Sequence, residues 1–192
     1  SGGVQPPTLM FCMGNVDTEE LRLSIKNEPR TYLTDFIPSE YFGQNNQFIL
    51  VGLRNIMGKA KEDGLNLTTE RTIVITGLRK GEAWINMTRV NGVNGTDPES
   101  LTRGEIEARK QIEDIITYLT KYVPGFQDSY FLKTAPFLGI RETRRIRGLY
   151  TMTKDDILGQ RRFDDVIAVA SYPIDIHHPV GGGCTLEWSG DS

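Results

Sequence analysis

The stretch Arg71–Val90, RTIVITGLRKGEAWINMTRV, decides the fold of this chain. Its two halves, Arg71–Leu78 and Glu82–Val90, are rich in β-branched and aromatic residues, and in the first half isoleucines alternate with other side chains. Arg79-Lys80-Gly81 between them is a short connection of the kind that joins neighbouring strands. The stretch therefore predicts an antiparallel hairpin.

Two helices flank this hairpin in the sequence. Asp97-Pro98 supplies a helix cap and a proline in the first turn, which predicts a long helix from Pro98 to Tyr122 that ends before Pro124-Gly125. A second helix is expected from Asn46 to about Lys61, with Gly64 as its stop. Further extended segments are predicted at Thr8–Val16, Tyr130–Ile140, Thr143–Met152, Asp165–Ser171 (buried) and Thr185–Trp188. The fold class that follows is α+β, a mostly antiparallel sheet with two main helices, in a single domain over residues 1–192.

The length, net charge and composition of the chain limit the classes of function that it can have. A length of 192 residues is enough for one domain with its own core. The formal net charge of −3 provides no overall basic field for nucleic acid. No apolar run approaches the ~20 residues that span a bilayer, so no membrane span is expected. Cys12 and Cys184 have no metal-binding spacing and are interpreted as free thiols, one in a strand and one in a loop.

A charged segment, Gly139–Gly148, lies between apolar residues and contains four arginines and one glutamate. In a strand, Glu142 and Arg144 would share one face and form a partly buried pair. Arg141, Arg145 and Arg147 would then share the other face without an internal carboxylate. Arginine suits bidentate binding of carboxylate or phosphate, so this row predicts an anion site, although an exposed basic edge strand explains the charges equally well.

The only two histidines, His177 and His178, lie in Tyr172–Pro179. Histidine suits proton transfer near neutral pH, and Asp175 could orient His177. An ordinary surface loop is the other interpretation. Two adjacent histidines support no metal site. The run Gly181–Gly183 is not followed by a helix, so it is expected to be a flexible connector rather than a nucleotide loop.

Several segments together resemble one family. They are Pro7–Phe11, Leu138–Ile146, the Thr153-x-x-Asp156 motif, Gly159–Asp165 and Tyr172–His177. The resemblance is to bacterial FAD-dependent oxidoreductases of the glutathione-reductase type, and it is densest over residues 137–178. The glycine-rich FAD-binding unit of such enzymes is absent here. The resemblance, with the Ser-Gly start, therefore implies an excised central region, the substrate or cap domain of a two-domain flavoprotein.

This resemblance carries expectations for the site. Arg141, Arg144 and Arg145 would face the flavin or an anionic group of a small-molecule substrate, and Tyr172, Asp175 and His177 would line the same cavity. The fragment alone is expected to hold no FAD tightly and to be inactive, with the missing FAD-binding domain of the parent chain as its partner. Phe131, Phe137 and Tyr172 are the candidates for an exposed apolar patch against that domain.

Two other functions stay open at this point. One is a non-catalytic module that binds an anionic or carbohydrate ligand through the arginines and exposed aromatic residues. The other is a stand-alone hydrolase that uses His177 or His178, for which no nucleophile motif is present. The sequence leaves the compartment of the bacterial parent open between cytoplasm and export.

Overall fold

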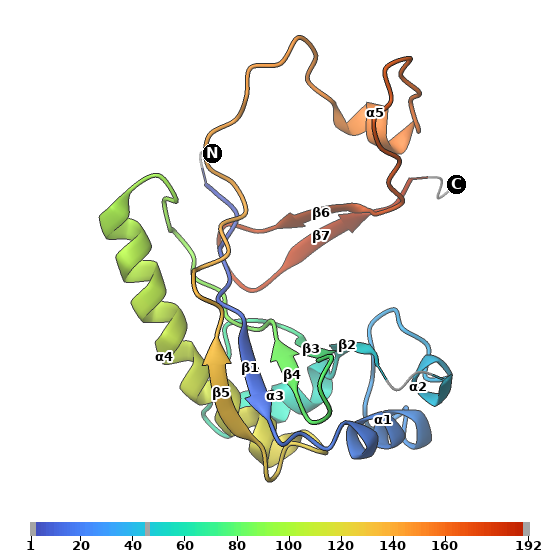
Figure 1. The fold of residues 1–192 in the computed structure, drawn as a ribbon, viewed down its shortest axis with the longest axis vertical. Coiled ribbons are helices and arrows are strands. Elements are labelled where there is room, and N and C mark those ends of the chain that lie inside the picture. The colour runs from blue at the N-terminus through green and yellow to red at the C-terminus, as the bar shows by residue number, and fades with distance from the viewer. Residues whose placement is uncertain (1–2, 45–46, 190–192) are drawn as a thin grey trace.

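The computed structural model describes residues 3–44 and 47–189 of the chain and contains a five-stranded sheet and a separate hairpin (Figure 1). All strand pairs in the described residues are antiparallel, and the larger sheet has the order β2-β3-β4-β1-β5. Its strands are β1 (Phe11–Gly14), β2 (Ile49–Gly52), β3 (Thr72–Thr76), β4 (Ala83–Ile85) and β5 (Tyr130–Thr134). The hairpin consists of β6 (Ile174–His177) and β7 (Cys184–Glu187). The fold is α+β, as the sequence predicted.

The hairpin predicted around Arg79-Lys80-Gly81 is the pair β3–β4, in which Ile75 lies opposite Trp84. The helices are α1 (Thr18–Asn27), α2 (Tyr41–Gln44), α3 (Arg54–Glu62), α4 (Pro98–Tyr122) and α5 (Lys154–Leu158). Helix α4 has the predicted bounds, with Asp97 accepting a hydrogen bond from the backbone of Ser100. None of the helices in the described ranges has the length and apolarity to cross a membrane.

One hydrophobic core lies between the sheet and the helices. In Figure 1, helix α3 lies behind the sheet, and α4 starts to the left of the sheet and ends behind it. The two helices contribute Met57 and Ile115 to this core. Tyr118 is fully buried, and its hydroxyl hydrogen-bonds to Thr72 of β3 at 2.6 Å. Burial of this ring raises the pKa of its hydroxyl far above the ordinary value. The helix and the sheet are therefore joined by apolar packing and by a satisfied buried polar contact.

The predicted helix from Asn46 to Lys61 is wrong in its first part. Ile49–Gly52 instead form edge strand β2, whose backbone pairs with β3. Gly52 and Leu53 both have positive φ angles, of 148° and 54°, and this left-handed turn separates β2 from α3. A Cβ on Gly52 would lie 2.5 Å from a backbone oxygen, so only glycine fits the approach of the 33–35 segment. Asn46, the first residue of the predicted helix, lies outside the described residues.

The region after Gly139 differs most from the sequence prediction. Thr143–Met152 forms no strand, and the predicted buried strand Asp165–Ser171 is exposed coil, with Ile167 fully accessible to solvent. Neither segment pairs with a strand of the described residues, so no backbone ladder holds it extended. Conversely, strand β6 lies within Tyr172–Pro179, for which a surface loop was one interpretation. The glycines 181–183 connect β6 to β7, and Cys184 lies in β7 rather than in a loop.

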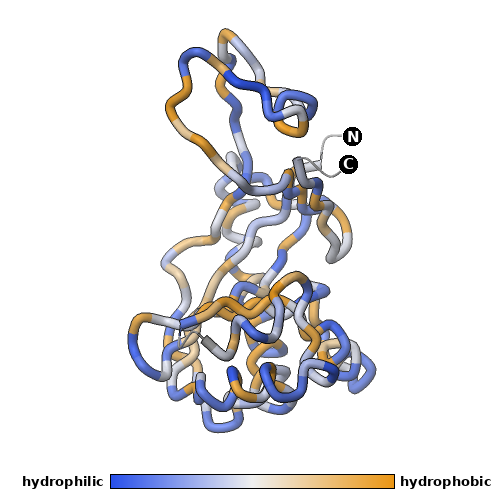
Figure 2. The backbone as a smooth tube through the Cα atoms, turned by 90° about the vertical axis from the view of Figure 1, so that its right-hand side faces the viewer, coloured by the Kyte–Doolittle hydropathy of each residue, from blue (hydrophilic) through white to orange (hydrophobic). Residues whose placement is uncertain are grey.

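Residues 140–173 form an excursion from the molecule, here called the arm (Figure 1). Figure 2 shows that hydrophilic and hydrophobic residues alternate along it. Its tip has a small polar and aromatic cluster in which Arg161 lies 5.0 Å from the rings of both Tyr150 and Phe163 and pairs with Asp156 at 3.0 Å. Thr153 and Asp156 form a capping box at the start of α5. The arm is thus held by polar contacts rather than by a core.

Candidate functional site

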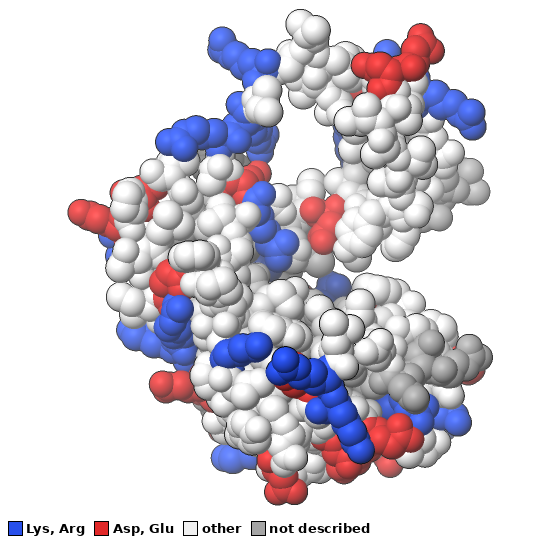
Figure 3. Space-filling model, viewed as in Figure 1, with Lys and Arg blue, Asp and Glu red and all other residues white. Residues whose placement is uncertain are grey.

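A cleft of about 310 Å³ lies where the β6–β7 hairpin faces the end of the larger sheet. Figure 3 shows the molecule hollowed between these two parts, with blue and red side chains at the border of the hollow. The sheet contributes the segments that lead into β1 and β3 and the segment that leaves β4. The lining includes Thr8, Glu70, Arg71, Thr88, Arg89, Arg141, Tyr172, Asp175, His177 and Cys184. The cleft is mixed in charge and rich in hydrogen-bonding groups.

Arg89 is the most deeply buried charge of this cleft, with 6% of its surface exposed. Its guanidinium donates to the backbone oxygens of His178 and Gly183, at 2.5 and 3.0 Å, and approaches His177 Nδ1 at 3.3 Å. Its Nε is buried and has no partner within the described residues. Burial lowers the pKa of Arg89, and the nearby Arg141 lowers it further. Arg89 therefore links the β6–β7 turn to the segment after β4 by hydrogen bonds, and its Nε–H remains without an acceptor.

His177 and Asp175 are on the same face of β6 and form a close pair. His177 Nε2 lies 3.5 Å from Asp175 Oδ2. Since arginine can only donate, the contact with Arg89 assigns an acceptor role to Nδ1 and puts the ring proton on Nε2, toward Asp175. Burial, Arg141 and Arg89 lower the pKa of His177 against the opposing effect of Asp175, so the ring is neutral at pH 7. Asp175 Oδ1 is buried without a hydrogen-bond partner in the described residues.

Arg141 closes the cleft from the start of the arm. Its Nε donates to the backbone oxygen of Pro6 at 3.0 Å, and its Nη2 lies 3.5 Å from Thr8 Oγ1. The next residue, Glu142, accepts a hydrogen bond from the backbone of Gln5 at 2.8 Å, and this contact is the main reason that its pKa is lowered. Gln5 in turn accepts from the backbone of His177. The N-terminal segment thus ties the arm base to the hairpin.

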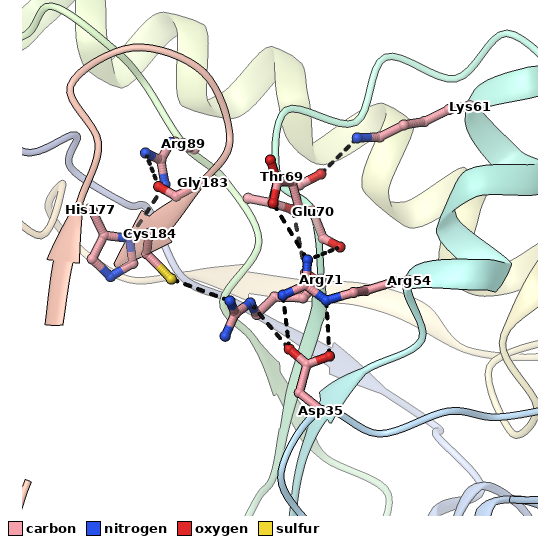
Figure 4. A network of polar contacts seen from close by, with 10 residues as sticks. All are labelled: Asp35, Arg54, Lys61, Thr69, Glu70, Arg71, Arg89, His177, Gly183 and Cys184. Atoms are coloured by element: carbon pink, nitrogen blue, oxygen red, sulfur yellow. Dashed lines mark hydrogen bonds and ion pairs between the residues drawn. The ribbon is translucent and has the colours of Figure 1, made fainter. Parts of the chain in front are cut away.

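A chain of ion pairs holds Glu70 and Arg71, which line the cleft, to Arg54 and Asp35, which do not (Figure 4). Asp35 accepts two hydrogen bonds from Arg54, at 3.0 and 3.1 Å, and its second oxygen lies 3.4 Å from Arg71 Nε. Arg71 also donates to Cys184 Sγ at 3.2 Å, which links β3 to β7. Arg54 further pairs with Glu70 at 3.4 Å. The carboxylate of Asp35 therefore balances the charge of Arg71, so this arginine is less available to a ligand than Arg141 is.

The structure brings together four of the six predicted site residues: Arg141, Tyr172, Asp175 and His177 all line the cleft. Arg144 and Arg145 do not. They line an open depression at the arm base with Gly95, and Arg141 borders both this depression and the cleft.

The predicted Glu142–Arg144 pair is corrected by the structure. Glu142 forms its ion pair with Arg145, at 2.9 Å, and within the described residues no ion pair joins it to Arg144. The segment is irregular rather than a strand, so strand alternation does not decide which side chains meet. Glu142 is nevertheless partly buried and paired with an arginine, and it is less exposed than Arg141.

Arg89, Arg71 and Cys184 are among the cleft residues that the sequence did not predict as site residues. The sequence placed both arginines in predicted strands and Cys184 in a loop. The sequence holds one signal for Arg89: it is a charge within the strand-like run Glu82–Val90, where burial requires partners. Both cysteines are free thiols, as expected, and Cys12 is buried. Burial raises the pKa of the Cys12 thiol, and that residue lies away from the cleft.

The described residues contain no group of three or more histidine, cysteine or carboxylate residues placed to hold a metal ion. No curated protein and no solved structure matched this chain. The family model described as FAD dependent oxidoreductase matches residues 1–192, the whole sequence. The chain therefore belongs to the FAD-dependent oxidoreductase family.

Proposed function

We propose that this chain is the substrate, or cap, domain of a bacterial FAD-dependent oxidoreductase of the glutathione-reductase type. In this role it covers the flavin and shapes the site where a small molecule binds. The observation that carries the proposal is the cleft, in which the buried Arg89 and the His177–Asp175 pair are joined by Arg141 from the arm. Buried charges without full compensation are costly to keep and typical of functional sites.

The described residues do not fit the adenine dinucleotide half of FAD. Such a site needs a parallel βαβ unit with glycines between the first strand and its helix. Here β1 precedes α1, but β1 pairs antiparallel with both of its neighbours, and the intervening Asn15-Val16-Asp17 has no glycine fingerprint. The cofactor of the family is therefore assigned, in this proposal, to a separate domain of the parent chain.

Exposed apolar side chains support the presence of such a partner. Phe137 and Tyr172 are 78% and 73% exposed, and Phe131 on edge strand β5 is 46% exposed. All three were expected to be exposed if another domain covers them. Tyr172 also lines the cleft, so a domain that packs over it would close the cleft from solvent. Arg144 and Arg145, which lie outside the cleft, remain proposed contacts of the flavin domain or its cofactor.

The test is whether the 192-residue chain holds flavin. Purified chain incubated with excess FAD and then passed over a desalting column should retain no visible flavin absorbance, because it has no dinucleotide fold in its described residues. Stoichiometric flavin in the protein fraction would contradict the proposal. In the full-length parent, Arg141→Ala should keep the ratio of flavin to protein while raising KM for the substrate, and Arg103→Ala on the exposed face of α4 is the matched control.

A non-catalytic binding module is the second candidate. Phe36, which is 60% exposed, and Tyr172 both border the cleft, and exposed aromatic rings beside polar groups suit carbohydrate binding. This candidate predicts that the isolated chain binds neutral sugars and that Phe36→Ala and Tyr172→Ala weaken the binding. Unchanged affinity in both variants would exclude it.

A further inference from the structure

Two arginines of the cleft have no carboxylate partner within the described residues. Arg89 directs its donors to two backbone oxygens and to neutral His177, and Arg141 contacts the oxygens of Pro6 and Thr8. Arg71, by contrast, is balanced by Asp35. Asp175 faces only the neutral ring of His177. Arg89 and Arg141 therefore carry two positive charges, against the one negative charge of Asp175. A ligand with one negative charge would neutralise this group of three.

Two buried atoms of the same group lack hydrogen bonds. Arg89 Nε is a donor without an acceptor, and Asp175 Oδ1 is an acceptor without a donor. Both residues line the cleft. A buried polar atom without a hydrogen-bond partner is destabilising, and more so when the group is charged. A ligand that supplies both an acceptor and a donor would remove both penalties at once.

His177 determines which oxygen of Asp175 is available. Its Nε2–H faces Oδ2, which leaves Oδ1 for another donor. The neutral ring cannot balance the carboxylate, so Asp175 keeps its attraction for a positively polarised group. His177 is therefore a positioning residue rather than a proton acceptor: its only basic nitrogen, Nδ1, already faces Arg89.

We propose that the cleft binds a small carboxylate whose neighbouring carbon carries a hydrogen-bond donor, that is, a 2-hydroxy or 2-amino carboxylate. The ligand carboxylate lies between Arg141 and Arg89, and its hydroxyl or amino group donates to Asp175 Oδ1. This inference rests on the proposed function, and it names the substrate class for the same site. The cleft volume of about 310 Å³ has room for such a carboxylate together with a side chain on the same carbon.

A carboxylate fits better than a phosphate ester. A phosphate monoester carries about −1.5 to −2 charges at pH 7 and presents only acceptors. Its charge would exceed the single excess positive charge of the cleft, and it would have no proton to donate to Asp175. A simple alkanoate would satisfy the arginines but leave Asp175 Oδ1 unpaired.

The experiment is a calorimetric titration of the purified chain at pH 7 with lactate, alanine, propionate and inorganic phosphate, each in a separate run. Lactate or alanine should bind more tightly than propionate by about tenfold, since one charged hydrogen bond separates them. The one that binds identifies the donor as hydroxyl or amine. Equal binding of propionate, or tighter binding of phosphate, would overturn the inference.

Two variants separate the two contacts. Arg141→Ala should weaken the preferred ligand about tenfold or more, and Arg103→Ala should not. Asp175→Asn should remove the preference over propionate while binding of propionate itself improves, because a negative charge is lost. Arg89 is left intact because its loss would release the hairpin. Circular dichroism checks that each variant is folded, and unchanged affinities in folded variants would contradict the proposal.

A wrong substrate class can be distinguished from a wrong proposed function. A chain that retains FAD contradicts the cap-domain role whatever the carboxylates do. A chain that retains no FAD and binds neither lactate nor alanine contradicts the substrate class alone.

Discussion

The body of the molecule and its arm are built on different principles. In the body, the side chains of β1 are all buried, and a single apolar core joins the sheet to the helices. In the arm, Ile146, Leu149 and Ile167 are almost wholly exposed, and the order comes from contacts such as Arg161–Asp156 and Lys154–Glu187. The cleft lies where the two meet. Packing supplies the stability of the body, whereas the arm leaves charged and apolar side chains exposed to solvent.

The largest expected effect tests this contrast directly. Phe11→Ala removes a fully buried ring from β1, which is paired on both sides, and should lower the free energy of unfolding by about 3–5 kcal/mol. Ile167→Ala in the arm should change it by less than about 0.5 kcal/mol, because the side chain has no buried surface to lose. Urea unfolding measures both. A large loss in the arm variant would show that the arm has a core after all.

The same contrast explains what the sequence could predict. Helix α4 was predicted to its end residues because its cap and its apolar spacing are local signals. The β3–β4 hairpin was predicted for the same reason. Strand β2 was missed because its apolar residues also suit a helix, and the pairing with β3 that decides between them is a contact between distant segments.

The site was predictable only in part for a related reason. Asp175 and His177 are two residues apart, so any strand that contains both puts their side chains on the same face. Arg141 was predicted from its charge in an apolar setting. Arg89 reaches the site only because the hairpin β6–β7, 88 residues further along the chain, folds back over it. No local pattern encodes that approach, and strand alternation failed at Glu142 because the segment is not in a sheet.

The second prediction concerns the junction between body and hairpin. Arg89→Gln removes a charge that donates to the backbone oxygens of His178 and Gly183 and leaves both oxygens short of donors. We expect a loss of about 2–3 kcal/mol, since hydrogen bonds from charged groups are stronger than neutral ones. Hydrogen exchange should rise in residues 174–187 more than in α4. Uniform exchange across the chain would mean that the hairpin and the body unfold as one unit.

The smallest effect is expected from pH, and it sharpens the account of the cleft. The pKa of His177 is lower in the folded chain than in the unfolded chain, mainly because of burial and Arg141, with Arg89 acting in the same direction and Asp175 against it. Below the unfolded value of about 6.5, the unfolded state therefore binds more protons than the folded state. The contribution of neutral His177 to the free energy of unfolding is fully present above that pH. It is lost as the pH is lowered from that value toward the pKa of the folded chain. Melting temperatures should consequently decline between pH 7 and pH 5, and His177→Gln should reduce the decline.

His178→Gln is the matched control for this measurement. The ring of His178 is exposed and hydrogen-bonds to Thr185 at 2.8 Å, so its removal should leave the decline of the native chain in place. Two further comparisons identify the cause. Arg141→Ala takes away a charge that opposes protonation of His177, and the decline should then become shallower. If His178→Gln flattened the profile and His177→Gln did not, the exposed ring would be the titrating group, and the neutral, positioning role of His177 in the cleft would be wrong.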